Sequence, residues 1–336
     1  KVRFWGGDLM KSKSNNLVKH YKDTSVMGFF EVLKHILKIL GNINYCKNDI
    51  LEFKPDRIIY IDYPGFNLRI CKWAKKKGFN NHYYISPQIW AWKENRINAI
   101  KRDVDHLHVI LPFEKNYYKK KHGLEVNYSG HPLVNYIDEF KPDNNFFDKN
   151  NIDNNQPIIA LLPGSRLQEI KKILPVFLSI VKSFESYQFV IGGVESINKE
   201  KYSKLIKNKN VKVVFDQTYN LLANADAAIV TSGTASLEAA IFNVPQVVCY
   251  KTSMITYLIS KILVNIKYIS LVNLILNNKV VDELVQGGLN SNSLKDSLNK
   301  ILKNDNKSKL IESYNDLKSM LYKDNPSKRT AELIIR

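Results

Sequence analysis

Two short stretches of small and polar residues have the composition of anion-binding turns. They are Pro163-Gly164-Ser165-Arg166 and Ser232-Gly233-Thr234-Ala235, and each stands between a β-rich run and a helical run. A helix that starts at such a turn presents free N–H groups to an anion, and the Arg166 guanidinium suits phosphate oxygens. The first turn alone is equally an ordinary strand-to-helix connection, and no Gly-Lys-Ser/Thr of a Walker loop follows it. Two such turns at neighbouring strand ends favour a nucleotide diphosphate.

Two carboxylates stand close to predicted strand ends. Glu238 lies one turn into the helix after the second stretch, where it could accept both hydroxyls of a ribose; an acidic residue after a Ser/Thr cap is also a common helix start. Asp62 directly follows the predicted strand Arg57–Ile61. At the carboxyl end of a parallel strand it could serve as a general base, or it could cap the next turn.

Aromatic residues and a histidine follow other predicted strands. Trp90 and Trp92 lie in the loop Ile85–Trp92, and exposed indoles suit a sugar face, an acyl chain or a membrane interface, while loop packing is the alternative. His131, in Gly130-His131-Pro132, follows the last strand of the first half and is predicted to face a cleft. A lone histidine is more often structural than catalytic.

Short β-rich runs alternate with amphipathic helical stretches, which is the pattern of βα units around a parallel sheet. The fold expected is α/β, with two Rossmann-like domains facing across a cleft and a helical C-terminal tail. The expected domains are residues 1–140, 156–310 and a tail of 311–336 that crosses back to the first domain, with a polar linker before residue 157. Strands are predicted at Arg57–Ile61, His82–Ile85, His106–Ile110, Glu125–Tyr128, Ile158–Leu162, Gln188–Ile191, Val211–Phe215, Ala227–Thr231 and Gln246–Tyr250.

Composition limits the classes of function. The 336 residues include 50 Lys and Arg against 32 Asp and Glu, a net charge of +18. This charge reflects either a drift toward Lys, Asn and Ile or an acidic partner such as anionic lipid or nucleic acid. The 44% hydrophobic content excludes global disorder, and three distant cysteines give no disulfide framework. No RNA-binding strand motif, helix-turn-helix, zinc finger or complete Gly-x-Gly-x-x-Gly supports nucleic-acid binding or a dinucleotide-dependent oxidoreductase.

Residues 27–40 form an amphipathic basic stretch. Apolar side chains that share one helical face would lie either in a protein core or in a membrane interface. No run of 18 uncharged apolar residues occurs. We therefore expect peripheral attachment rather than a transmembrane helix, and we expect no signal peptide. The members of this apolar stripe are Phe29, Phe30, Leu33, Ile36, Leu37 and Leu40.

Taken in order, these segments resemble bacterial lipid-A-disaccharide synthase, a GT-B glycosyltransferase family. The resemblance runs from about Phe4 to the last helix. It is carried by Phe53-Lys54-Pro55-Asp56, Ile61–Asn67, Ile85–Trp92, Leu111-Pro112-Phe113-Glu114, Gly130-His131-Pro132, Leu161–Arg166 and Ser232–Glu238.

The resemblance implies transfer of a sugar from UDP-2,3-diacylglucosamine to 2,3-diacylglucosamine 1-phosphate (lipid X), with inversion and without metal or cofactor. The products are a β-1,6 disaccharide 1-phosphate and UDP. Asp62 would take the proton of the acceptor hydroxyl, and Asn67, Trp90, Trp92 and His131 would lie on the acceptor side. By motif, the donor side comprises Ser165, Arg166, Gly233, Thr234, Ala235, Glu238, Asn273, Glu283 and Gln286.

The resemblance also carries expectations about location and assembly. It implies a cytoplasmic enzyme on the anionic inner face of the cytoplasmic membrane, and a C-terminal segment, residues 325–336, that packs on the first domain or on a second copy in a homodimer. The family begins with a strand and a Gly-Glu-x-Ser-Gly-Asp-type loop, which we expect to be missing before Lys1. Many members carry Asp where this chain has Gly65, which leaves Asp62 as the local base.

One alternative of the same fold remains open at this point. The donor-side segments fit another UDP-sugar enzyme, such as the peptidoglycan N-acetylglucosaminyltransferase or a UDP-sugar 2-epimerase. The Asp62 segment and the Trp90–Trp92 loop argue against these enzymes. A requirement for acyl chains on the donor would decide between the two interpretations.

Overall fold

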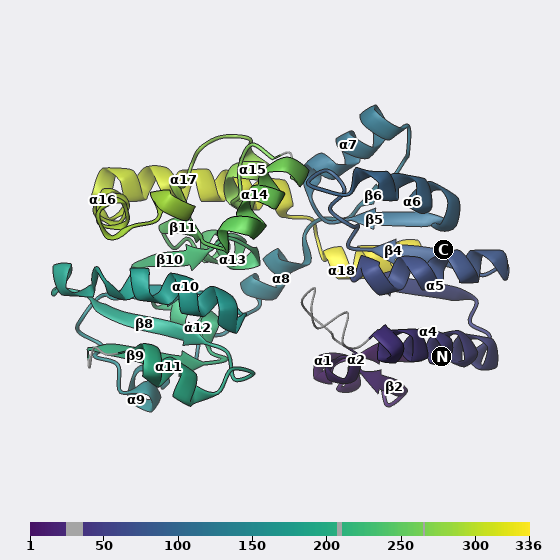
Figure 1. The fold of residues 1–336 in the computed structure, drawn as a ribbon, viewed down its shortest axis with the longest axis horizontal. Coiled ribbons are helices and arrows are strands. Elements are labelled where there is room, and N and C mark those ends of the chain that lie inside the picture. Colours follow the sequence, from purple (N-terminus) through teal and green to yellow (C-terminus); the bar gives the residue numbers. More distant parts are fainter. Residues whose placement is uncertain (25–35, 207–209, 265) are drawn as a thin grey trace. The chain divides into compact units, whose positions relative to one another are not determined.

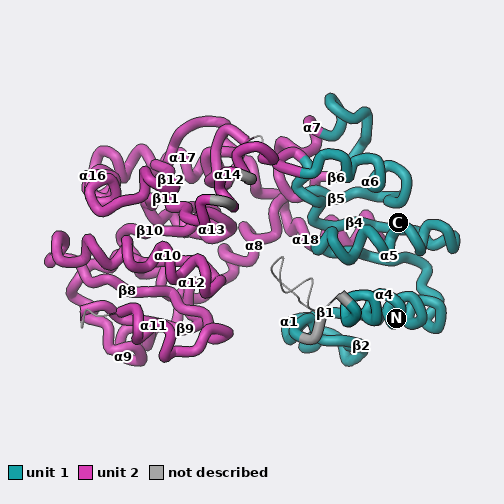
Figure 2. The backbone as a smooth tube through the Cα atoms, viewed as in Figure 1, with its two compact units in different colours: residues 1–89, 93–109, 118–127 teal, residues 90–92, 110–117, 128–336 magenta. Residues whose placement is uncertain are grey.

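The computed structural model describes residues 1–24, 36–206, 210–264 and 266–336. The backbone separates into two compact units, shown in different colours in Figure 2. Unit 1 comprises residues 1–89, 93–109 and 118–127, and unit 2 comprises residues 90–92, 110–117 and 128–336. Two short pieces of the N-terminal half, the Trp90–Trp92 segment and residues 110–117, therefore belong to the unit that contains the C-terminal half.

Helices and strands alternate along the chain, as Figure 1 shows. Up to residue 140 the elements are β1 (Phe4–Gly6), α1 (Asp8–Lys11), β2 (Leu17–His20), α2 (Tyr21–Thr24), α4 (Ile36–Phe53), β3 (Arg57–Ile61), α5 (Pro64–Lys76), β4 (Asn80–Tyr84), η1 (Glu94–Arg96), α6 (Ile97–Asp103), β5 (His106–Val109), α7 (Pro112–His122), β6 (Asn127–Tyr128) and α8 (Pro132–Asp138).

The second half continues the alternation and ends in helices. Its elements are α9 (Phe146–Asn150), β7 (Ile158–Leu162), α10 (Leu167–Leu178), η2 (Val181–Ser183), β8 (Gln188–Gly193), α11 (Lys199–Leu205), β9 (Val211–Phe215), α12 (Thr218–Ala223), β10 (Ala227–Thr231), α13 (Thr234–Ile241), β11 (Gln246–Tyr250), α14 (Met254–Leu263), α15 (Leu271–Leu276), β12 (Glu283–Val285), η3 (Gln286–Gly288), α16 (Ser291–Leu302), α17 (Asn304–Leu321) and α18 (Pro326–Ile335).

Unit 1 is built on a parallel sheet in which β3, β4 and β5 follow one another, with β6 at the far edge. Helix α5 packs on β3 and β4. It buries Ile70 and Ala74, and the Tyr83 side chain of β4 is buried as well. Strands β1 and β2 pair in a separate two-stranded parallel sheet.

Unit 2 is built on a six-stranded parallel sheet of order β12-β11-β10-β7-β8-β9. From β7 the chain proceeds outward through β8 and β9, and it then returns to place β10, β11 and β12 on the other side. The strand order therefore reverses between β7 and β10, which is the point where open parallel sheets bind ligands, at the strand carboxyl ends. Every residue of β7 and β10 is buried, as expected for central strands covered on both faces.

The C-terminal helices complete unit 2. Helix α16 packs against β10, β11 and α17, while α18 packs against α8. Two hydrogen bonds join the end of α17 to the segment before α8: the His131 N–H donates to the Leu321 carbonyl (3.0 Å), and the Tyr128 hydroxyl donates to the Met320 carbonyl (2.9 Å).

Most of the predicted elements agree with the structure, and the differences have local causes. Five predicted strands have the observed bounds, and the C-terminal tail is helical as expected. Strand β4 ends before Ile85, whose φ of +61° takes the backbone out of the extended region. The short strand β12 was not predicted because three residues show too little alternation, and α9 lies inside the predicted linker.

The predicted amphipathic stretch 27–40 lies only partly within the described residues. Phe29, Phe30 and Leu33 are outside them, and Ile36 begins α4. Leu37 and Leu40 are both exposed, so neither packs into a core of the described chain. Among the helices that the structure describes, none has the length and apolarity to cross a bilayer.

Candidate functional site

The turn between β7 and α10 has the geometry of a tight strand-to-helix connection. Gly164 adopts a φ of +105°, which favours glycine, and a Cβ there would lie 2.7 Å from Oε2 of Glu169. Arg166 is the N-cap residue of α10, so the first free N–H groups of this helix follow it directly. Its Nη1 donates to Oε1 of Glu169 at 2.8 Å in an exposed ion pair. This bond engages one of the five N–H donors of the guanidinium.

The turn between β10 and α13 lies beside the first one. Strands β7 and β10 are hydrogen-bonded neighbours with Leu162 opposite Val230, so the turns that follow them share one edge of the sheet. Gly233 adopts a φ of +150° and precedes Thr234, the first residue of α13. The Ser232 hydroxyl donates to the Ile269 carbonyl (2.7 Å), which ties this turn to the segment before α15. The two predicted anion-binding turns are therefore brought together at the switch point.

A tyrosine fixes the orientation of the Glu238 side chain on α13. The Tyr219 hydroxyl donates to Oε1 of Glu238 at 3.1 Å. Burial raises the pKa of Glu238, and the hydrogen bond from Tyr219 opposes that rise. The Tyr219 ring lies 5.3 Å from the Phe242 ring and 5.5 Å from the Phe140 ring, between centroids, so its position is fixed by aromatic packing.

Asn273 and Glu283 form a hydrogen-bonded cluster that fixes the segment between α15 and β12. The buried Asn273 amide donates to the Val281 carbonyl and to Oε1 of Glu283, both at 2.9 Å. Its Oδ1 accepts the backbone N–H groups of Val280 and Val281, and the Glu283 carboxylate accepts those of Ile269 and Ser270. Both side chains therefore serve the local structure of the loop that carries them.

Gln286 differs from these two residues because its side chain has a buried N–H donor without a partner within the described chain. Its Oε1 accepts the Thr252 N–H at 3.0 Å, just before α14. Its Nε2 is buried and has no hydrogen-bond partner within the described part of the chain. An unsatisfied buried amide is costly, by about 1–3 kcal/mol, and a ligand oxygen could satisfy it.

In unit 1, Asp62 occupies a constrained turn at the end of β3. Asp62 and Tyr63 both have left-handed backbones, with φ of +45° and +46°. The turn is locked through the Asp62 carbonyl oxygen, which accepts from the Tyr83 hydroxyl (2.6 Å) and from the Asn67 amide (2.7 Å). The residue is exposed, but the surrounding protein partly desolvates its carboxylate and raises the pKa of Asp62, while the Tyr63 N–H opposes the rise. A raised pKa at a strand carboxyl end suits a general base.

The predicted acceptor-side residues fall into two structural situations. Trp90 is half-buried, and its Nε1 donates to Oε1 of Glu114 at 3.1 Å. His131 is buried, its Nδ1 accepts the Leu133 N–H at the start of α8, and burial lowers the pKa of His131 to about 4. Trp92, by contrast, exposes 41% of its surface. Of these three side chains Trp92 is therefore the exposed one, whereas Trp90 and His131 make hydrogen bonds that support the local fold.

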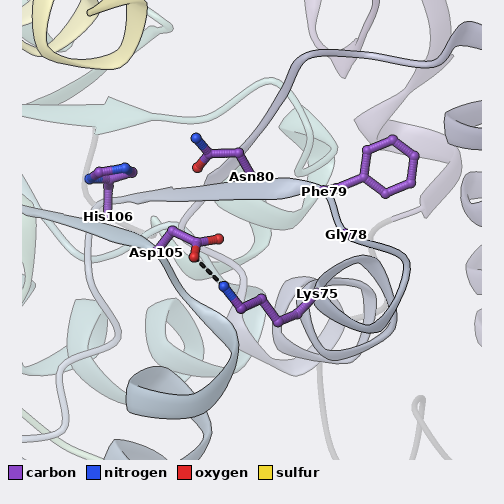
Figure 3. A pocket seen from close by; sticks show the side chains of 6 residues that line it. All are labelled: Lys75, Gly78, Phe79, Asn80, Asp105 and His106. Atoms are coloured by element: carbon purple, nitrogen blue, oxygen red, sulfur yellow. Dashed lines mark hydrogen bonds and ion pairs between the residues drawn. The ribbon is translucent and has the colours of Figure 1, made fainter.

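A separate hollow lies at the opposite edge of the unit 1 sheet. Figure 3 shows Asn80, Asp105 and His106 around it, with Lys75 directed toward the Asp105 carboxylate in an ion pair. Its volume is about 290 Å³. Asn80 and His106 are the first residues of β4 and β5, so the hollow is at the amino edge, while Asp62 is at the carboxyl edge. Among the described residues, no group of three His, Cys, Asp or Glu side chains is placed to hold a metal ion.

Comparison with known proteins gives the family. The family model described as lipid-A-disaccharide synthetase matches residues 2–335. The lipid-A-disaccharide synthase of Coxiella burnetii (strain CbuG_Q212) is 33% identical over 339 residues, which cover 99% of this chain and 90% of that protein. The chain belongs to the lipid-A-disaccharide synthetase family. It is thus a glycosyltransferase of lipid A biosynthesis, and the resemblance seen in its motifs is confirmed.

Solved structures show that this lipid-A-disaccharide synthetase family member has the predicted GT-B fold. The UDP-GlcNAc 2-epimerase from Neisseria meningitidis, bound to UDP-GlcNAc, matches with a TM-score of 0.61 at 13% identity, covering 95% of this chain and 85% of that one. The glycosyltransferase of kitacinnamycin matches with a TM-score of 0.59 at 12% identity, covering 99% and 91%. At these identities the likeness concerns the fold alone.

Sequence reasoning identified the turn residues of this lipid-A-disaccharide synthetase family member but not their partners. Glu169, Tyr219 and Glu114 each hold a predicted site residue in place. Glu114 belongs to a motif that carried the resemblance, and this was the available signal for it. Nothing in the sequence marks Tyr219, because its hydrogen bond to Glu238 joins a residue of α12 to a residue of α13 and so depends on the tertiary structure.

Proposed function

We propose that the chain joins UDP-2,3-diacylglucosamine to lipid X, giving the β-1,6-linked disaccharide 1-phosphate and UDP with inversion at the anomeric carbon. One observation carries the donor side of this proposal: two glycine-containing turns, each opening a helix, share the sheet edge where the strand order reverses. Helix N-termini at such a point offer N–H groups to the negative charge that develops on a leaving diphosphate. Neither a metal nor a cofactor is part of the proposed reaction.

The donor-side roles follow from these positions. Ser165 and Arg166 hold phosphate oxygens, and Gly233, Thr234 and Ala235 cradle the diphosphate. Glu238 accepts the ribose hydroxyls, and its fixed orientation by Tyr219 supports this role. Asn273 and Glu283 shape the loop that lines the UDP-sugar. The Nε2 group of Gln286, which has no partner within the described chain, donates a hydrogen bond to the UDP-sugar.

In the proposed chemical step, Asp62 acts as the general base. The 6-hydroxyl oxygen of lipid X forms a bond to the anomeric carbon as its proton passes to the Asp62 carboxylate. The bond from that carbon to the β-phosphate oxygen breaks, and its electron pair leaves with UDP. The raised pKa of Asp62 supports the assignment, and Asn67, Trp90, Trp92 and His131 form or support the acceptor side.

The setting of the reaction is also a proposal. Both substrates carry acyl chains, so we infer that the chain works on the anionic inner face of the cytoplasmic membrane, with residues 29–40 in contact with it. Residues 1–140 would serve the acceptor and residues 156–310 the UDP-sugar. Residues 311–336 would cross back to the first domain or join a second copy in a homodimer. Sedimentation velocity would detect the homodimer.

The test is a turnover assay with UDP-2,3-diacylglucosamine and lipid X in excess EDTA, with UDP binding measured in parallel. We expect disaccharide and UDP from the wild type, and a loss of ~10²–10⁴-fold in kcat for Asp62→Ala with UDP affinity retained. Asp56→Ala is the matched control, because Asp56 is an exposed aspartate just before the other end of β3.

The outcomes separate the parts of the proposal. Binding of UDP without disaccharide formation would overturn the substrate assignment, and epimerisation of UDP-GlcNAc would replace it with the alternative of the same fold. Equal activity of the Asp62→Ala and Asp56→Ala variants would remove Asp62 as the base. Absence of UDP binding would overturn the donor-side assignment.

A further inference from the structure

Helix α14 presents large apolar side chains to solvent. Met254, Leu258 and Ile262 are 66%, 54% and 84% exposed, and they follow one another at intervals of four residues. Side chains four apart lie on the same side of a helix, so the three form one row. Leu263, at the end of the helix, is 57% exposed as well. A contiguous apolar surface of this kind marks an interaction site more often than chance exposure does.

The surroundings of the row are cationic. Lys261 lies within α14, Lys251 precedes the helix and Lys267 follows it, and the sequence has no Asp or Glu between Glu238 and Asp282. Lys261 lies beside the row on the same helix, with its Nζ 5.4 Å from the centre of the Tyr257 ring. Exposed apolar side chains in a stretch of sequence that carries lysines and no Asp or Glu match an anionic lipid surface, in which acyl chains meet phosphate groups.

The helix is anchored to unit 2 independently of the row. The Ser253 hydroxyl accepts the Thr256 N–H at 3.1 Å and caps the first turn. Just before it, the Thr252 N–H donates to the buried Gln286 side chain at the sheet. With 10 residues α14 is too short to span a bilayer. It can therefore lie in an interface while its base stays fixed to the sheet.

We propose that α14 is an interfacial lipid-binding element, with Met254, Leu258 and Ile262 at the acyl boundary of an anionic phospholipid bilayer and Lys261 at its headgroups. The inference rests on the proposed function, since it gives the unit that holds the donor turns its own contact with the membrane. It is independent of residues 29–40. A second protein copy is a less fitting occupant, because like-charged lysine patches would face each other in a symmetric pair.

The first experiment is flotation of the full chain with vesicles of phosphatidylglycerol and phosphatidylethanolamine, compared with phosphatidylcholine alone. We expect the Met254→Gln/Leu258→Gln/Ile262→Gln variant to lose at least ~10-fold in partitioning to anionic vesicles. Lys261→Gln/Lys267→Gln should weaken binding mainly at low salt. The matched control is Leu9→Gln/Met320→Gln, which removes two exposed apolar side chains elsewhere and should bind as the wild type does.

A second readout does not depend on the stability of the triple variant. The substitution Leu258→Cys is placed in a Cys46→Ser background, in which the remaining native cysteines, Cys71 and Cys249, are buried. An environment-sensitive dye attached to the introduced thiol should shift its emission to the blue with anionic vesicles and not with phosphatidylcholine.

Three results would overturn the inference. They are unchanged flotation of the triple variant, an unshifted dye, or a wild-type dimer that the triple variant loses, which would assign the row to a second copy. UDP binding and turnover of detergent-dispersed short-chain substrates are measured on the same proteins. If one of the three results is obtained while UDP binding and turnover persist, only the lipid-binding inference fails. If UDP binding and turnover are absent from the wild type as well, the proposed function fails.

Discussion

The indole Nε1–H of Trp90 donates to Oε1 of Glu114 at 3.1 Å, while Oε2 of the same carboxyl accepts the backbone N–H groups of Ile110 (3.2 Å) and Leu111 (2.9 Å). Glu114 is almost completely buried, and burial raises its pKa to about 7 despite these three donors. The carboxyl group thus holds the start of the Trp90–Trp92 segment against the segment that leads into α7.

Because both oxygens of Glu114 face donors, an amide cannot replace the carboxyl. We expect Glu114→Gln to lower the free energy of unfolding by ~1–3 kcal/mol, since its NH₂ would face another N–H. In a Trp90→Phe background the penalty should shrink, and urea unfolding of the four proteins measures this coupling. Equal penalties in the two backgrounds would contradict the contact.

Linkage gives the same substitution a pH dependence. The pKa of Glu114 is raised in the folded protein, so the folded state binds more protons than the unfolded state between the ordinary value of 4.5 and about 7. The stability contributed by the protonated carboxyl is therefore present below pH 4.5 and is lost as the pH rises through 7. We expect the stability difference between wild type and Glu114→Gln to be larger at pH 5 than at pH 8.

Removal of the Tyr219 hydroxyl should weaken UDP binding through Glu238. Tyr219→Phe deletes a hydrogen bond that lowers the pKa of Glu238. We expect a loss of roughly 3–10-fold in UDP affinity at neutral pH, and a shift of the pH midpoint for binding to higher pH. Calorimetric titration across pH measures both. Tyr136→Phe is the control, because Tyr136 packs on the Tyr219 ring and is itself exposed; an equal effect from it would refute the role of the hydroxyl.

Asn273 should matter first for stability. Asn273→Ala removes the side-chain partners of the Val281 N–H and of the Val281 carbonyl in a buried site, and it takes from Oε1 of Glu283 one of its two donors. We expect a loss of ~2–4 kcal/mol in the free energy of unfolding, read by urea denaturation. Asn292→Ala, at an exposed position of α16, should change little. A variant of normal stability that no longer binds UDP would instead show a direct contact with the donor.

Acid should destabilise unit 1 through two stacked histidines. Nδ1 of His82 lies 3.2 Å from Nε2 of His108, and burial, followed by neighbouring imidazoles, lowers the pKa of each to about 4. The unfolded state therefore binds more protons than the folded state between pH 6.5 and 4. Stability is fully present above pH 6.5 and is lost as the pH falls toward 4.

Denaturant unfolding across this range checks the histidine prediction. His108→Gln should flatten the slope of stability against pH, because one group no longer titrates. His20→Gln, in the small β1–β2 sheet, should leave the slope as it is. An unchanged slope in His108→Gln would contradict the assignment.

Most of the strands of this protein can be located from its amino-acid sequence alone. Apolar runs such as Ile158–Leu162 and Ala227–Thr231 are long enough and uniform enough to specify buried parallel strands, and glycine followed by polar residues specifies the turns after them. The ordered motifs likewise determined the family. Each of these signals comes from residues that are neighbours in the chain, so the sequence is sufficient to recognise it.

The identity of the interacting residues, by contrast, depends on how distant elements pack together. The order β11-β10-β7-β8 puts the turns at Gly164 and Gly233 side by side, although they are far apart in sequence. Packing also makes His131 buried and Trp90 half-buried, while it leaves Trp92 and the row on α14 exposed. The side chain of a tryptophan, a histidine or a methionine is compatible with either environment, and the contacts that select one come from elements distant in the chain.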